Sequence, residues 1–154
     1  MNAVDDGWAP LTPRDAVELL AGLRIAWWVA GGWALELAGA EAPRRHGDLD
    51  VAILRPEHEA LRDELEGWDL RIAHRGALRP WTGGVVELPA NAVWARPRGE
   101  DRWFFDFKIE LVDGGDWVYR RDRAFRRPLA TIGRTTRDGI PYLAPEIATL
   151  YARG

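Results

Sequence analysis

The chain has 154 residues, enough for one compact domain with its own core, and 47% hydrophobic with 29% charged residues is a globular composition. The net charge of −3 does not favour nucleic-acid binding, and the absence of cysteine excludes disulfides and thiolate metal sites. No apolar run approaches the ~18 residues of a membrane span, and the N-terminus lacks the regions of a signal peptide. We therefore expect a cytoplasmic single domain over residues 1–154, with residues 1–11 as a loose arm.

The first predicted helix lies in the segment LTPRDAVELLAGL. Thr12 is a candidate cap, Pro13 suits the first helical position, and Asp15 stands where a capping box needs an acid. Gly22 is expected to end this helix. The apolar run that follows, residues 25–30, is typical of a buried strand.

Two glycines, Gly31 and Gly32, lie at the junction between this strand and a second helix, which is expected to begin near Trp33 and to stop at Gly39. Glycine lets the backbone approach a ligand closely, and the free N–H groups of a helix start suit a phosphate. Tight packing against a tryptophan explains the pair equally well, so the glycines alone predict no site.

The polar loop PRRH carries Arg44, Arg45 and His46 just before a second predicted strand, DLDVAIL. Arginine can clamp phosphate oxygens through its planar fork, whereas His46 either bonds a phosphate or holds the loop. A helix is predicted over residues 55–68, beginning near Pro56, and a strand over residues 68–74.

Asp48 and Asp50 are two residues apart on the predicted strand, so their side chains leave the same face with Cα atoms roughly 6.5–7 Å apart. Magnesium prefers oxygen ligands and is commonly shared between carboxylates and phosphates. The alternative is an ordinary exposed strand face with two acids.

The segment from 76 to 100 is rich in Gly, Pro and Trp, and predicts loops with short strands around VVEL and AVWA. A clearly alternating strand follows in RWFFDFKIELV, and turns at DGGD and at Asp138-Gly139 lead to further short strands. A last helix begins at Pro145 and is short, because the sequence stops at Gly154. This mixed order predicts an α/β or α+β fold with a mixed sheet.

The alternating strand places Asp106, Lys108 and Glu110 on one face and its apolar residues on the other. If this strand pairs beside DLDVAIL, a third carboxylate joins Asp48 and Asp50, and three such groups repel one another unless cations neutralise them. Asp106 can also act as a general base. Glu110 competes for this position, and Lys108 can pair with either acid.

Together, these motifs resemble the small antibiotic nucleotidyltransferases of the DNA polymerase beta superfamily, nearest to the lincosamide and aminoglycoside 2''-nucleotidyltransferase branch. The resemblance spans residues 25–151. It is carried by a G-G-W, an acid three residues later, an R-x-H, a D-x-D and an apolar-D-apolar strand. These residues are Gly31, Gly32, Trp33, Glu36, Arg44, His46, Asp48, Asp50 and Asp106.

The resemblance implies a mixed sheet flanked by helices, and a Mg²⁺-dependent transfer of a nucleoside monophosphate, usually from ATP, to a hydroxyl of a small molecule. Pyrophosphate is released, and antibiotic resistance is the family association. By this analogy Asp48 and Asp50 hold the metals. Asp106 completes the metal site and activates the acceptor hydroxyl.

The same analogy places Gly31 and Gly32 against the triphosphate, helped by Arg44 and His46. A homodimer is compatible with the resemblance. Three tryptophans are candidates either for the acceptor wall or for the core, namely Trp81, Trp94 and Trp103.

Two other functions stay open at this point. Some superfamily members are toxins that modify tRNA or protein, and the arginine-rich stretch at residues 120–127 is compatible with an RNA substrate, although the acidic net charge opposes it. The fold can also serve as a non-catalytic nucleotide-binding module.

Overall fold

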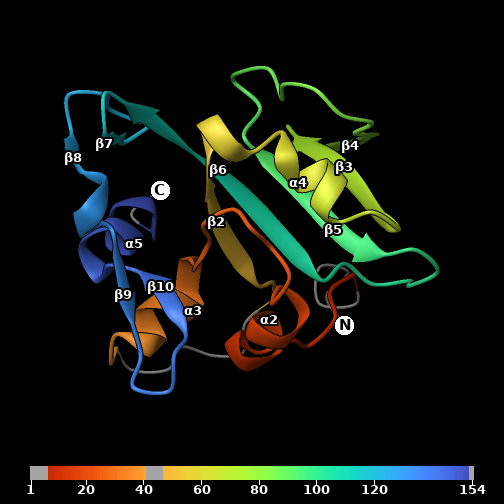
Figure 1. Ribbon diagram of the computed structural model, residues 1–154, viewed down its shortest axis with the longest axis horizontal. Coiled ribbons are helices and arrows are strands. Elements are labelled where there is room, and N and C mark those ends of the chain that lie inside the picture. The colour runs from red at the N-terminus through yellow and green to blue at the C-terminus, as the bar shows by residue number, and fades with distance from the viewer. Residues whose placement is uncertain (1–6, 41–46, 153–154) are drawn as a thin grey trace.

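The computed structural model describes residues 7–40 and 47–152. Its strands form a mixed sheet in the order β4-β3-β5-β6-β2-β1-β10-β9, from which β7 and β8 continue beyond β6 (Figure 1). The strands are β1 (Trp28–Val29), β2 (Asp50–Leu54), β3 (Trp68–His74), β4 (Ala77–Pro80), β5 (Ala92–Pro97), β6 (Phe105–Asp113), β7 (Asp116–Val118), β8 (Arg126–Pro128), β9 (Gly133–Thr135) and β10 (Pro141–Leu143).

The described α-helices are α2 (Pro13–Leu19), α3 (Gly31–Leu37), α4 (Ala60–Glu64) and α5 (Pro145–Ala152), with short 3₁₀ turns η1 (Arg55–Glu57) and η2 (Leu129–Thr131). Strands β2 and β6 pair in parallel, as do β1 and β10, whereas β5 runs antiparallel to both β3 and β6. The predicted fold class, a mixed α+β sheet with flanking helices, is confirmed. The single domain over 1–154 stays a prediction.

One face of the sheet is buried against α2 and α4. The predicted alternation of β6 is confirmed, because Phe105, Phe107 and Ile109 are all at most 1% exposed. They join Val51 and Ile53 of β2 in the main hydrophobic core, together with residues of both helices. The opposite face of β6 carries Asp106, Lys108 and Glu110.

The start of α2 follows the predicted capping box. The Thr12 hydroxyl accepts from the Asp15 backbone N–H, and the Asp15 carboxylate accepts from the Thr12 N–H at 2.8 Å. Pro13 occupies the first turn, where its missing N–H costs nothing. The helix ends at Leu19, three residues before the Gly22 expected to stop it.

Several predicted bounds are wrong by a few residues. The strand expected over 25–30 contains only Trp28 and Val29, and α3 begins at Gly31 rather than near Trp33. Strand β2 begins at Asp50, so Asp48 lies just before the strand instead of on it. Within the described ranges, no helix reaches the length and hydrophobicity that a membrane crossing requires.

Two tryptophans in sequence, Trp27 and Trp28, pack on different sides of the sheet. Trp27 lies against the main core, and Trp28 lies against a second hydrophobic cluster that contains Trp117 and residues of α5. A Cβ on Gly133 of β9 would collide with the Trp28 indole, so this glycine makes room for the ring. The second cluster holds α5 against the site face of the sheet.

The helix expected over 55–68 is broken into η1 and α4 by a buried histidine. His58 is 2% exposed, and its Nδ1 lies 2.6 Å from the Arg55 carbonyl, while its Nε2 accepts from the Val86 N–H at 3.0 Å. This bonding requires a neutral ring that donates through Nδ1. The ring also stacks on Trp81. The expected strand around VVEL is absent, because Val86 is held by His58 and by the Arg55 side chain rather than by a neighbouring strand.

Replacing His58 with Ala is expected to destabilise the fold by about 2–4 kcal/mol, since it leaves the buried Val86 N–H unpaired and opens a cavity. Urea unfolding followed by tryptophan fluorescence measures the change. His74→Ala, which removes a half-exposed ring with no comparable pair of bonds, is the matched control. Equal unfolding midpoints for the two variants would contradict the bridging role of His58.

Candidate active site

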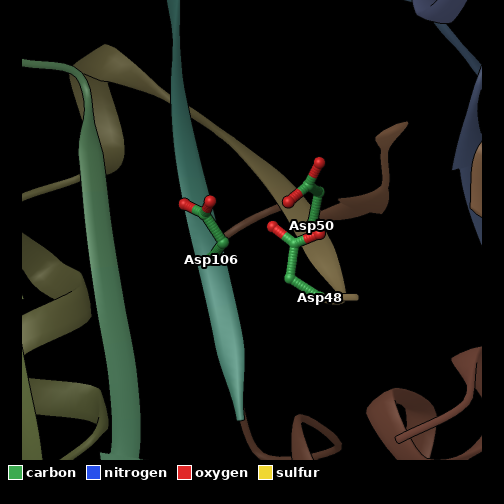
Figure 2. A group of neighbouring side chains, drawn as sticks. All are labelled: Asp48, Asp50 and Asp106. Atoms are coloured by element: carbon green, nitrogen blue, oxygen red, sulfur yellow. The ribbon is translucent and has the colours of Figure 1, made fainter. Parts of the chain in front are cut away.

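Three carboxylates converge on the open face of the sheet. Asp50 of β2 lies opposite Asp106 of β6 in the parallel pair, and Asp48 approaches from the residues that lead into β2. Each offers one carboxylate oxygen, and these oxygens all lie within 4.8 Å of one another. Figure 2 shows the three neighbouring side chains, with Asp48 and Asp50 beside β2 and Asp106 on β6. The convergence expected from the sequence is therefore present.

Gly31 permits the position of Asp50. It has a left-handed φ of 62°, and a Cβ built on it would overlap the Asp50 carboxylate. The Ala30 N–H donates to the Asp50 carbonyl at 2.8 Å, which fixes the two segments side by side. The glycine is thus required by both its backbone conformation and the space that Asp50 occupies.

Burial and mutual repulsion make this group of acids costly. Burial first, and then the charges of Asp106 and Asp48, raise the pKa of Asp50 well above its usual range. Burial raises the pKa of Asp106 to about 6, although Lys108 opposes the rise. Burial works to lower the pKa of Lys108, but the nearby carboxylates outweigh it and the pKa is raised.

From the sequence, Lys108 was expected to pair with either Asp106 or Glu110. In the structure it pairs with Asp106. Its Nζ lies 2.9 Å from Asp106 Oδ2, with the Asp106 side chain 6% exposed. One ammonium neutralises only part of three carboxylates. Asp50 Oδ1 and Asp106 Oδ1 are buried, and neither has a hydrogen-bond partner among the described residues.

These residues fit a divalent cation. Orphaned buried carboxylate oxygens are rare unless an ion or water satisfies them, and an all-oxygen set is the chemistry that Mg²⁺ prefers. The fit rests on oxygens that have no partner among the residues that the structure describes.

Glu110, the rival for the third carboxylate, does not join the cluster. Its Oε1 accepts from Trp117 Nε1 at 2.9 Å and from the Tyr151 hydroxyl at 2.7 Å. It is 1% exposed, and burial raises its pKa, although these hydrogen bonds oppose the rise. Glu110 therefore ties β6 to β7 and α5, and the geometry brings Asp106 to Asp48 and Asp50 instead.

A cavity of ≈ 290 Å³ lies on the Asp50 side of the carboxylates; we call it the Asp50-side cavity. Gly31 and Gly32 are among its lining residues, and their contact with a ligand stays a prediction. Its lining is Ala30, Gly31, Gly32, Leu35, Asp50, Lys108, Glu110, Arg120, Arg121, Leu143, Ala148, Tyr151 and Ala152.

A second cavity, of ≈ 410 Å³, lies on the Asp106 side; we call it the Asp106-side cavity. Lys108 lines both cavities, so the carboxylate cluster lies at the boundary between them. The lining of the Asp106-side cavity is Ala73, His74, Arg75, Gly76, Ala77, Leu78, Asn91, Ala92, Trp94, Asp106 and Lys108.

Arg120 and Arg121 are site residues that the sequence did not single out as such, since they appeared only as part of an arginine-rich stretch. Both guanidinium groups lie over the Tyr151 ring, at 4.8 Å and 5.4 Å from its centroid. The Arg120 Nε is buried without a partner among the described residues. The sequence feature that could have identified them is their position just after the predicted return strand, β7, which leads the chain back toward the cavity.

The other predicted site residues have mixed positions. Arg44 and His46 lie outside the described residues. Of the three candidate wall tryptophans, Trp94 lines the Asp106-side cavity, whereas Trp81 is 4% exposed and packs on His58. Trp103 is buried against Trp94 and the guanidinium of Arg96 and lines neither cavity.

Two comparisons find known proteins that are similar to this chain. A family model described as aminoglycoside-2''-adenylyltransferase matches residues 14–74, a span that holds Gly31, Asp48 and Asp50 but ends before Asp106. Among curated proteins, no sequence matches the chain. The fold is similar to the crystal structure of the lincosamide antibiotic adenylyltransferase LnuA with lincomycin bound. The TM-score is 0.56 and the identity 15%, over 90% of this chain and 82% of that one.

The family match confirms the resemblance to antibiotic nucleotidyltransferases predicted from the sequence, and with it the predicted enzyme class, nucleotidyltransferase. The structural match, at 15% identity, shows a shared fold only. The assignment to the nucleotidyltransferase class rests on the family match.

Gly31→Ala is expected to weaken divalent cation binding by about 10- to 100-fold, because the added Cβ displaces the Asp50 carboxylate. Isothermal titration of the purified protein with Mg²⁺, and with Mn²⁺ followed by electron paramagnetic resonance, measures the affinity. Gly22→Ala is the control, since a Cβ there meets nothing within 4 Å. Unchanged affinity in Gly31→Ala would show that the glycine does not position the site.

Asp50→Asn is expected to raise the stability of the metal-free protein at neutral pH by about 1–2 kcal/mol, because it removes a buried charge that its neighbours repel. Thermal melting in the presence of a chelator measures this. Asp63→Asn, at an exposed position of α4, should leave the melting temperature unchanged. A lower melting temperature for Asp50→Asn would mean that the carboxylate stabilises the fold.

Proposed function

We propose that the protein is a Mg²⁺-dependent nucleotidyltransferase that transfers a nucleoside monophosphate, AMP from ATP, to a hydroxyl of a small molecule and releases pyrophosphate. The observation that carries the proposal is the position of three carboxylates at the boundary of two cavities. Such a transfer needs a donor and an acceptor that meet at one cation-binding centre. Antibiotic resistance and a cytoplasmic location belong to this proposal.

The Asp50-side cavity is the proposed donor site. Its two arginines can hold phosphate oxygens through their planar guanidinium groups, and its apolar wall, which includes Leu35 and Leu143, suits a nucleoside. The backbone at Gly31 and Gly32 opens onto the same cavity. Arg44 and His46 remain proposed phosphate ligands on the strength of the sequence.

Asp48, Asp50 and Asp106 are the proposed metal ligands. Bound Mg²⁺ would neutralise these acids and stabilise the negative charge of the reacting phosphates. The protein's own groups would orient the acceptor and handle its proton. The acceptor oxygen forms a bond to the α-phosphorus, the bond from that phosphorus to pyrophosphate breaks, and the hydroxyl proton passes to the Asp106 carboxylate.

The structure gives no specific support to an RNA acceptor. Two arginines of the arginine-rich stretch are already engaged in ion pairs: Arg126 with Asp113 and Asp116, and Arg127 with Glu146. A phosphate backbone would have to compete with these carboxylates, whereas the small-molecule proposal uses only the cavity-lining pair.

Isothermal titration with ATP and Mg²⁺ tests the donor part of the proposal. The wild type is expected to bind MgATP, and the double variant Asp48→Ala with Asp50→Ala is expected to lose this binding, because the ligands that join cation to protein are gone. Pyrophosphate release in the presence of hydroxylated small molecules should fall about 10²- to 10⁴-fold in Asp106→Asn, which lacks the proton acceptor.

Asp113→Ala provides the control, because this acid lies at the far end of the same strand and is exposed. If the double variant binds MgATP as well as the wild type does, the carboxylate cluster is not the donor site. If the wild type binds no nucleotide, the proposed function fails as a whole.

A further inference from the structure

We propose that the Asp106-side cavity is the acceptor site, and that it selects a hydroxylated molecule that is neutral or anionic rather than a polycation. The proposal rests on the function proposed above and adds the place and the charge class of the acceptor. It does not follow from the family match, whose description concerns an aminoglycoside.

The first argument is the position of the cavity relative to the carboxylates. Strand order places β5 and β3 beyond β6, on the side away from β2, so this cavity and the Asp50-side cavity flank the cluster from opposite sides. Asp106 lines this cavity, and its Oδ1 has no hydrogen-bond partner among the described residues. An acceptor in this place therefore lies beside the carboxylate proposed to take its proton.

The second argument is the charge of the lining. Among the described residues that line the cavity, Asp106 is the only carboxylate, and Lys108 already pairs with it at 2.9 Å. Arg75 adds a second cation from the turn between β3 and β4, and the His74 ring lies beside it in the lining. Among these lining residues a polycationic acceptor would meet the like charges of Arg75 and Lys108 and a single carboxylate that Lys108 already pairs with, which costs affinity.

Charged groups next to the cavity do not add a free negative charge among the described residues of β3. On β3, Arg71 contributes no free charge to this face, since it pairs with Asp69 at 3.1 Å and lies over Trp103. Cations bound at the carboxylate cluster would add positive charge at the floor. Among the described residues that line this cavity, the positive side chains therefore outnumber the single carboxylate, Asp106, which Lys108 pairs with.

The third argument is an unpaired donor in the lining. Asn91 Nδ2 is buried and has no hydrogen-bond partner among the described residues. Its backbone is fixed, because the Asn91 carbonyl accepts from the Ile109 N–H at 2.8 Å. An amide held in this way is suited to donate to a hydroxyl or ring oxygen of the acceptor.

The remaining wall is apolar and rigid. Trp94 is held edge-on by Trp8 at 4.8 Å and by Trp103 at 5.8 Å, and alanines and Leu78 form the rest. An apolar wall with a few polar groups is the usual form of a small-molecule site. Together with Asn91, it fits the apolar and oxygen-bearing faces of a sugar-like molecule.

Pyrophosphate release with MgATP tests the charge class directly. Three pools are compared at equal concentration and ionic strength: neutral saccharides and nucleosides, sugar phosphates and uronates, and aminoglycosides. We expect the neutral or anionic pool to stimulate release above the acceptor-free rate and the aminoglycosides to give none. Stimulation by aminoglycosides alone, or by no pool, would overturn the acceptor proposal.

Variants place the acceptor within the cavity. With the most active compound of the stimulating pool, Asn91→Ala is expected to raise KM about tenfold with kcat little changed. Arg75→Glu should lower kcat/KM for an anionic acceptor by about tenfold or more, whereas Arg79→Glu, on the same hairpin but outside the lining, should not. Unchanged KM in Asn91→Ala, or equal effects of Arg75→Glu and Arg79→Glu, would overturn it.

MgATP titration of the wild type and of each variant separates the two proposals. Retained MgATP binding shows that a variant is folded and that its donor site is intact, so a change in KM belongs to the acceptor. A variant that no longer binds MgATP is replaced by Asn91→Ser or Arg75→Gln, to which the same criteria apply. Failure of the wild type to bind MgATP contradicts the function proposed above, not the location of the acceptor.

Discussion

The register of the parallel pair β2–β6 is the constraint on which the site depends. It places Asp50 opposite Asp106 and, on the other face, Val51 beside Phe107 within the core. Because side chains alternate along a strand, a slip of one residue would bury a carboxylate in the hydrophobic core and expose an aromatic ring at the site. Burial of the apolar face therefore fixes the carboxylates as firmly as it fixes the fold.

This register brings acids together where the described residues neutralise them only in part. Lys108 pairs with Asp106, but the unpaired oxygens of Asp50 and Asp106 remain buried. Gly31 contributes to this electrostatic cost. Because it has no side chain, the Asp50 carboxylate can lie against it, close to the other two acids. Such local destabilisation is expected where a site is prepared for a ligand, and an all-carboxylate group fits the proposed cation.

The parts of the site that were predictable from the sequence are those set by local periodicity. The alternation of β6 placed Asp106 and Lys108 on the face away from the core, and D-x-D with a pairing strand predicted the cluster. The capping box of α2 was equally local. These features follow from patterns of two to four residues, which no distant contact has overridden.

Long-range contacts decided the rest. His58 broke a helix because its ring bonds Val86, 28 residues away, and Asp106 prevailed over Glu110 because Trp117 and Tyr151 take the latter. The sequence around His58 or Glu110 does not indicate that these distant residues would bond to them. The arginine-rich stretch likewise has two roles, with Arg126 in surface ion pairs and Arg120 in a cavity.

The two cavities lie on opposite sides of the carboxylate cluster, which suits a reaction between two bound molecules. In an in-line displacement, the attacking and leaving oxygens lie on opposite sides of the phosphorus. The Asp50-side cavity is bounded by α3 and α5, whereas the Asp106-side cavity is bounded by β3, β4 and β5, and the carboxylates lie between them. If the donor occupies the first cavity, an acceptor in the second approaches the cluster from the opposite side. Lys108 lines both cavities, so its contact with Asp106 lies on the path by which the acceptor would reach the donor.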